Sequence, residues 1–156
     1  MVKKGNKALD FKAQALVKGE EKTISLKEFR GKKVALYFYP RDLTPGCTTQ
    51  ACNLRDNYKE LKKNNIEIIG VSKDSIKSHI KFAEKKELPF ILIADEDKKI
   101  NEAYGVWQEK SFMGRKFMGT LRQTFLIDEN GEIVNIIEKP VVGGHAGEII
   151  NGFKTI

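Results

Sequence analysis

A cysteine, a threonine and two prolines lie close together in one short stretch of the sequence. Cys47 follows a short loop that leaves an apolar segment, and the residues after it have helical spacing. Free backbone N–H groups and the helix dipole at a helix N-terminus lower the pKa of a thiol placed there. Thr44 lies on the same loop, where its hydroxyl could donate to a thiolate or to a substrate oxygen, and Pro40 and Pro45 restrict the loop backbone. We therefore interpret Cys47 as a nucleophile rather than as a small buried apolar residue.

The second cysteine, Cys52, lies five residues after Cys47. An even number of cysteines is compatible with a structural disulfide, but a cytoplasmic setting disfavours one. A zinc site normally has four ligands, and only His79 and His145 remain, without the His-x₃₋₅-His spacing. We expect neither a metal nor a cofactor.

Composition and length favour one folded unit. The chain has 156 residues, with 40% hydrophobic and 31% charged residues, which excludes a disordered or low-complexity chain. Its longest apolar run, Val34–Tyr39, is far shorter than the ~18 residues of a membrane span. No apolar stretch follows the first lysines, so we expect no secretory signal. The prediction is a single domain over 1–156, cytoplasmic and without a membrane partner.

The net charge of +7 is concentrated at the start of the chain. Residues 1–41 contain eleven Lys/Arg against four Asp/Glu, whereas residues 42–156 contain seventeen of each. Basic segments can bind nucleic acid or anionic membranes. These lysines are scattered over an expected hairpin, without the interleaved aromatic residues that stack on bases. We interpret them as a solvated surface and expect no nucleic-acid partner.

The hydrophobic pattern alternates between strands and helices. Continuous apolar runs predict strands buried on both faces, and helical spacing follows each of them. The expected strands are Val34–Tyr39, Ile66–Val71 and Phe90–Ala94, after an N-terminal hairpin of 11–17 and 23–26. The expected helices cover about 46–64, 76–87, 95–105 and 146–153, with a second hairpin of 124–127 and 132–137 around Asn130-Gly131. This order predicts an α/β fold with a mixed sheet and helices on both faces.

Some segments have weaker patterns. The stretch between Gly105 and Gly119 is expected to be a loop, with Phe112 and Met113 packed within it. His79 stands between Lys77 and Lys81 and is expected to be exposed. His145 is expected to cap the last helix, and the acidic run that begins at Asp95 is interpreted as a helix cap rather than a metal site.

Pro-x₃-Thr-x₂-Cys at Pro40, Thr44 and Cys47 resembles the signature of the peroxiredoxins. Further motifs resemble the bacterioferritin-comigratory (Q-type) branch of that family and occur in matching order from about Asp10 to Phe153. They are Phe38-Tyr39-Pro40, Thr44-Pro45-Gly46-Cys47-Thr48, Cys52, Gly70-Val71-Ser72, Tyr104-Gly105-Val106-Trp107, Arg122-x-Thr124-Phe125-Leu126-Ile127-Asp128 and Gly144-His145-Ala146. The departures, Leu9 in place of proline and Gln123 in place of serine, lie outside the chemical centre. The resemblance implies a thioredoxin-like sheet with an N-terminal β-hairpin.

The resemblance also implies the role of each site residue. Cys47 would attack hydrogen peroxide or an organic hydroperoxide and become a sulfenic acid. Arg122 would favour the thiolate and hold the peroxide oxygens, Thr44 would hydrogen-bond the peroxide, and Pro40 would shield the pocket. Cys52 would resolve the sulfenic acid as an intramolecular disulfide. A thioredoxin- or glutaredoxin-type reductant would clear this disulfide, and we expect the enzyme to act as a monomer.

Two other functions remain open from the residues alone. A disulfide reductase would need Cys-x₂-Cys, which the spacing of Cys47 and Cys52 does not provide. A non-catalytic binding or chaperone module would use the basic hairpin on nucleic acid or on acidic partners. Peroxide consumption and salt sensitivity separate these alternatives from a peroxidase.

Overall fold

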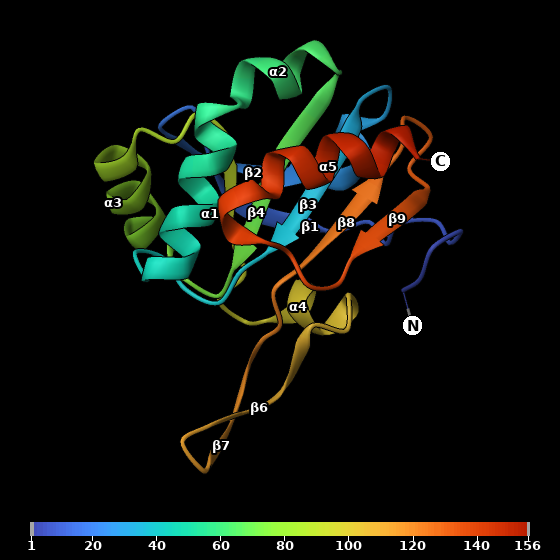
Figure 1. The fold of residues 1–156 in the computed structure, drawn as a ribbon. Coiled ribbons are helices and arrows are strands. Elements are labelled where there is room, and N and C mark those ends of the chain that lie inside the picture. Colours follow the sequence, from blue (N-terminus) through green and yellow to red (C-terminus); the bar gives the residue numbers. More distant parts are fainter. Residues whose placement is uncertain (1, 156) are drawn as a thin grey trace.

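Residues 2–155 are described by a computed structural model, whose centre is a seven-stranded mixed sheet (Figure 1). The strand order is β2-β1-β5-β4-β3-β8-β9, in which β3, β4 and β5 are parallel and the other pairs are antiparallel. The strands are β1 (Lys12–Val17), β2 (Glu20–Ser25), β3 (Lys33–Phe38), β4 (Ile66–Ser72), β5 (Ile91–Ala94), β8 (Gln123–Ile127) and β9 (Ile133–Ile137). The expected N-terminal hairpin and the hairpin around Asn130-Gly131 are both present.

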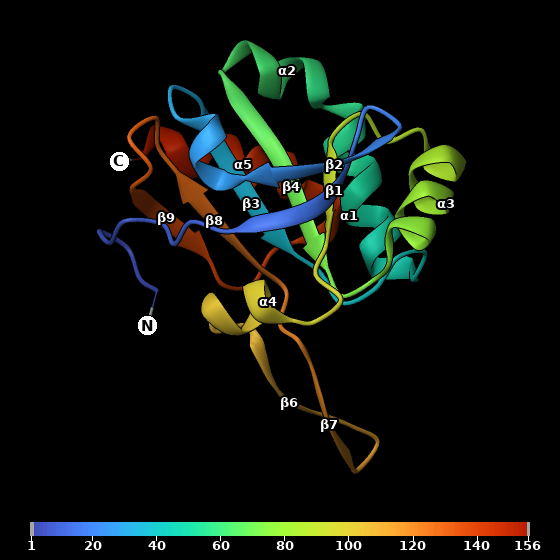
Figure 2. The ribbon, with the colours of Figure 1, turned by 180° about the vertical axis from the view of Figure 1, so that it is seen from behind.

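Helices lie on both faces of this sheet, as predicted. Figure 1 shows α1 and α5 across one face, and Figure 2 shows α4 on the other. The helices are α1 (Pro45–Asp56), α2 (Tyr58–Lys63), α3 (Ile76–Lys86), α4 (Lys99–Ala103) and α5 (His145–Lys154), with short 3₁₀ turns at Leu26–Phe29 and Val142–Gly144. Within residues 2–155, no helix is long and apolar enough to cross a membrane.

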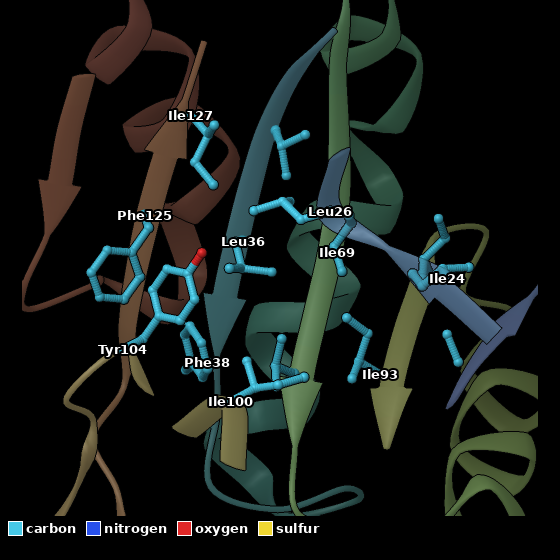
Figure 3. Close-up of a cluster of buried hydrophobic side chains, with 14 of the residues drawn as sticks. Ile24, Leu26, Leu36, Phe38, Ile69, Ile93, Ile100, Tyr104, Phe125 and Ile127 are labelled. Atoms are coloured by element: carbon cyan, nitrogen blue, oxygen red, sulfur yellow. The ribbon is translucent and has the colours of Figure 1, made fainter. Parts of the chain in front are cut away.

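The interior strand β3 is buried on both faces because its side chains alternate between two hydrophobic clusters. Leu36 and Phe38 point into the cluster that α4 covers, where Tyr104 and Phe125 pack against Phe38 (Figure 3). Tyr37 points into the opposite cluster, beneath α1, α3 and α5. This two-sided burial explains the continuous apolar run in the sequence and fixes the end of β3, from which the loop to α1 departs.

Two predicted segments differ from the structure. The single helix expected over 46–64 is interrupted at Asn57, whose side chain donates to the Asn53 carbonyl and competes with the helical pattern. The loop expected between Gly105 and Gly119 is instead an antiparallel hairpin of β6 (Trp107–Phe112) and β7 (Arg115–Thr120). This hairpin stands away from the body of the molecule (Figures 1 and 2).

The side chains at the tip of that hairpin are not packed. Phe112 is 68% exposed and Met113 is 87% exposed, so the expectation that they pack within a loop was wrong. The two-residue turn, Met113-Gly114, has positive φ at both positions, which is the geometry of a type I′ hairpin turn. A strand pair with both faces in solvent lacks the apolar–polar alternation that would have identified it.

Both histidines are fully buried, which contradicts the prediction that His79 is exposed. His79 is on the inner face of α3 together with Phe82, while Lys77 and Lys81 lie on the outer side. His145 is the first residue of α5 rather than its cap, which is Gly144. The helix expected over 95–105 is shorter than predicted, since α4 begins at Lys99 and its N-cap is Lys98. The Asp95 carboxylate still accepts hydrogen bonds from two backbone N–H groups at the start of α4.

His145 is held between two polar partners. Its Nε2 lies 2.8 Å from Thr124 Oγ1, and its Nδ1 lies 2.9 Å from Glu148 Oε1. Burial lowers the pKa of His145 below its usual value, against the opposing effect of Glu148. The folded protein therefore takes up a proton at this imidazole less readily than the unfolded chain does.

We expect this histidine to destabilise the protein in acid. As the pH falls below about 6.5, the unfolded chain is protonated first, so the free energy of unfolding should decrease by at most about 1.4 kcal/mol per pH unit from this group. Urea denaturation between pH 5 and 8 measures the effect, and His145→Gln is the matched control without the titrating group. An identical pH dependence in both proteins would contradict the assignment.

Candidate active site

Three elements meet at one edge of the sheet and bring Cys47 next to Arg122. In the antiparallel pair of β3 and β8, Phe38 is opposite Gln123, so Arg122 enters β8 beside the end of β3. The loop that leaves β3 leads directly into α1, which begins at Pro45. The strand register thus brings together Cys47 and Arg122, which are 75 residues apart in the sequence.

Cys47 lies in the first turn of α1 and is only 2% exposed. Arg122 Nη2 donates to its sulfur at 3.4 Å. Gly46 makes room for this contact, because a Cβ at that position would be 3.3 Å from the same guanidinium nitrogen. The thiol therefore lies beside a fixed positive charge and within the first turn of a helix.

Gln50 holds the guanidinium in place, and the sequence prediction missed it. Arg122 Nη1 donates to Gln50 Oε1 at 2.6 Å, while Nη2 of the same fork contacts Cys47. Gln50 is fully buried, and its Nε2 has no hydrogen-bond partner among the described residues. Its position three residues after Cys47 on one helical face was the available signal.

Thr44 and Pro40 lie on the loop between β3 and α1. Thr44 is the N-cap residue, and its carbonyl accepts the first helical hydrogen bond, from the Thr48 N–H at 2.8 Å. Its hydroxyl donates to the Arg41 carbonyl at 2.8 Å, so its own oxygen lone pairs are left to accept a hydrogen bond. Pro40 is half-buried directly after the buried Tyr39.

Cys52 lies on the same continuous helix as Cys47, and both thiols are free. Helical geometry separates Cα atoms five residues apart by roughly 8.6 Å. A disulfide needs ~4.4–6.8 Å between Cα atoms. The two cysteines are near in sequence but cannot join while this helix is intact.

Tyr37 is a further buried polar group at the site that the sequence did not identify. Its hydroxyl has no hydrogen-bond partner among residues 2–155, and burial, followed by the nearby Cys47, raises its pKa well above the usual value. Gly70 lets the ring fit, since a Cβ there would lie 2.9 Å from two ring carbons. Tyr37 therefore stays protonated, and it is an uncharged buried group close to the thiol.

The positive charge of Arg122 also affects Lys110, a residue of the β6–β7 hairpin. Burial, and then Arg122, lower the pKa of Lys110, whose ammonium donates to the Thr120 carbonyl at 3.1 Å.

Within the described part of the chain, no group of three or more His, Cys, Asp or Glu residues could hold a metal ion. The site places a buried thiol beside a guanidinium, which is the arrangement of a thiol-dependent oxidoreductase.

Comparison with known proteins identifies the family. The model of the AhpC/TSA family matches residues 4–136. The chain is 46% identical over 152 residues to a putative peroxiredoxin Bcp of Haemophilus influenzae, covering 97% of this chain and 96% of that protein. It is 42% identical over 151 residues to peroxiredoxin Bcp of Bacillus subtilis, covering 96% and 94%. The chain thus belongs to the AhpC/TSA family and is a peroxiredoxin of the Bcp type, a peroxidase that uses a peroxide substrate and a thiol reductant.

Solved structures of this branch have the same fold. A cysteine-to-serine mutant of Xanthomonas campestris peroxiredoxin Q superposes with a TM-score of 0.85 at 34% identity, covering 93% of this chain and 90% of that one. The bacterioferritin comigratory protein of the same organism, studied for its alkyl peroxide reduction activity, gives 0.84 at 33% identity over the same shares. These neighbours confirm the predicted thioredoxin-like fold and the predicted family.

Proposed function

We propose that Cys47 is the peroxidatic residue and that it reduces hydrogen peroxide and organic hydroperoxides. The thiolate attacks one peroxide oxygen, the O–O bond breaks, and Cys47 becomes a sulfenic acid while the other oxygen leaves as water or an alcohol. The observation that carries this proposal is the contact of Arg122 with the Cys47 sulfur. The same guanidinium can hold the leaving oxygen, where negative charge develops.

Two residues of the loop between β3 and α1 complete this site. The oxygen of Thr44 can accept a hydrogen bond from the peroxide, and the half-buried Pro40 limits access of water. Organic hydroperoxides are included because alkyl peroxide reduction is the activity studied in the related Xanthomonas protein. All these groups come from one chain, so a monomer over residues 1–156 would suffice.

We further propose that Cys52 resolves the sulfenic acid. Its thiol attacks the Cys47 sulfur, a disulfide forms, and the hydroxyl of the sulfenic acid leaves as water. A thioredoxin- or glutaredoxin-type dithiol then reduces the disulfide and is itself oxidised. Reductants of this kind keep thiols reduced in the cytoplasm, where we place this protein.

Steady-state turnover tests the proposal. Purified protein is mixed with hydrogen peroxide or an alkyl hydroperoxide, together with either a thioredoxin system or a glutaredoxin–glutathione system. Consumption of peroxide that depends on one of these reductants supports it. Absence of consumption with both reductants and with dithiothreitol would refute a peroxidase role for Cys47.

The distance between the cysteines leads to a prediction about α1. We expect its first turns to unwind when the disulfide forms, with loss of amide protection over residues 46–54. Asn53 joins this segment to the start of α5, because it donates to the Gly143 carbonyl and accepts from the Ala146 N–H. The Ala146 amide should therefore lose protection as well.

Hydrogen exchange with mass spectrometry compares the reduced and disulfide forms. The internal control is α3, where we expect equal protection in both states. Unchanged protection across residues 46–54, with the disulfide confirmed by mass, would contradict the prediction.

A further inference from the structure

A buried polar cluster joins the loop before α1 to α3, and the chemistry proposed above uses none of it. The side chains of Asp42 and His79 are 1% and 0% exposed, and Asp42 Oδ2 lies 2.7 Å from His79 Nδ1. The Ser78 hydroxyl donates to the same oxygen at 2.8 Å, and the Tyr39 hydroxyl donates to Oδ1 at 2.7 Å. Three side chains thus hold one buried carboxyl group.

The hydrogen-bond partners of His79 show which of its ring nitrogens carries a hydrogen. Its Nε2 lies 2.9 Å from the Ile93 carbonyl, which only accepts, so Nε2 is protonated. At 2.7 Å, Nδ1 and Asp42 Oδ2 are joined by a second hydrogen bond of this ring. A buried pair of this kind is costly to break, because removing one partner leaves the other without compensation.

The cluster holds the loop that precedes the thiol. The backbone N–H of Asp42 donates to Asp74 Oδ2 at 2.9 Å, which is a second attachment to the segment between β4 and α3. Leu43, the next residue, has φ of 61°, a left-handed conformation that is unfavourable for a non-glycine residue. Its neighbour Thr44 is the N-cap of the helix that carries Cys47. The strained backbone at Leu43 lies between the attached Asp42 and the helix N-cap Thr44, and it will relax if either of them is released.

We propose that the Asp42–His79 pair is a positioning element for Cys47. It fixes loop 41–44, and through it the first turn of α1, in the arrangement that reacts with peroxide. The same attachment sets how readily this turn unwinds to bring Cys47 to Cys52. This inference rests on the proposed function, since it assigns two successive steps to these cysteines.

Loss of the pair should affect the two steps in opposite directions. Oxidation of Cys47 by peroxide needs the folded turn and should become slower. Disulfide formation needs the unwound turn and should become faster. A general loss of stability that did not involve this loop would leave the ratio of the two rates unchanged.

The experiment measures both rates in single turnovers by rapid quenching, alkylation and mass analysis of the sulfenic acid and the disulfide. The variants are His79→Ala, which removes one partner, and Asp42→Asn, which keeps the shape of the side chain. Ser78→Ala, which removes one hydroxyl, is the mildest change. Leu26→Ala is the control, because Leu26 is a core residue of the hydrophobic cluster on the other face of the sheet.

We expect His79→Ala to slow oxidation by about tenfold, the effect of losing a hydrogen bond to a charged group, and to accelerate disulfide formation. Asp42→Asn and Ser78→Ala should shift both rates in the same sense by smaller factors. Leu26→Ala should lower the melting temperature without changing the ratio. If His79→Ala fails to fold, the ratio in Ser78→Ala decides.

Two results would overturn the inference. Variants whose two rates change in parallel, or remain at the wild-type values, would show that the cluster is only structural. In that case peroxide consumption by the wild type would still support the proposed function. A wild-type protein that does not react with peroxide would overturn both.

Discussion

Peroxide reduction is expected to fall to the uncatalysed rate in Cys47→Ser, because a serine hydroxyl at neutral pH is not ionised and is a far weaker nucleophile than a thiolate. Cys52→Ser should differ from it. That variant keeps the thiol, the Arg122 contact and the start of the helix, so it should react once with peroxide and stop as a sulfenic acid.

A dimedone-type probe followed by mass spectrometry distinguishes the two variants. The label is expected on Cys47 in Cys52→Ser and absent from Cys47→Ser. The two substitutions are each other's matched control, because they make the same chemical change on the same helix. Full turnover by Cys47→Ser, or labelling of Cys52 instead, would reverse the assignment.

Arg122→Ala is expected to slow the oxidation of Cys47 by about 10- to 100-fold, which corresponds to the loss of one hydrogen bond to a charged group. The substitution removes the positive charge 3.4 Å from the sulfur. Arg122→Lys should give an intermediate result, because one ammonium cannot contact both Cys47 and Gln50 as the guanidinium fork does.

The rate of Cys47 oxidation by peroxide in a single turnover measures this effect. Arg115→Ala is the matched control, since Arg115 is an exposed arginine of the β6–β7 hairpin. If Arg122→Ala reacts like the wild type, Arg122 has a structural role only.

The sequence predicted the sheet because β3 and β4 are buried on both faces, so their residues form continuous apolar runs. It also predicted the pairing of β8 with β9, since Asn130-Gly131 specifies the turn. The β6–β7 hairpin was missed for the opposite reason. Both of its faces are exposed, and its Met113-Gly114 turn does not have the Asn-Gly signature.

The candidate site was predicted where its residues are neighbours in sequence, as Thr44 and Cys47 are. Gln50 and Tyr37 could not be placed, because their roles depend on the packing of α1 over β3 and on the position of Arg122. The prediction that His79 is exposed was wrong because Lys77 and Lys81 lie on the outer side of α3, whereas Phe82 shares the buried face with His79. Residues two apart on a helix point away from each other, whereas residues three apart share a face.

Trp107 is the single tryptophan of the chain. It begins the β6–β7 hairpin and pairs with Thr120, two residues before Arg122. The ammonium groups of Lys73 and Lys98 lie 5.7 and 5.4 Å from its ring centroid. The indole emission of this protein therefore comes from one chromophore that lies close to two ammonium groups, so its spectrum reports the electric field at the base of the hairpin without any label.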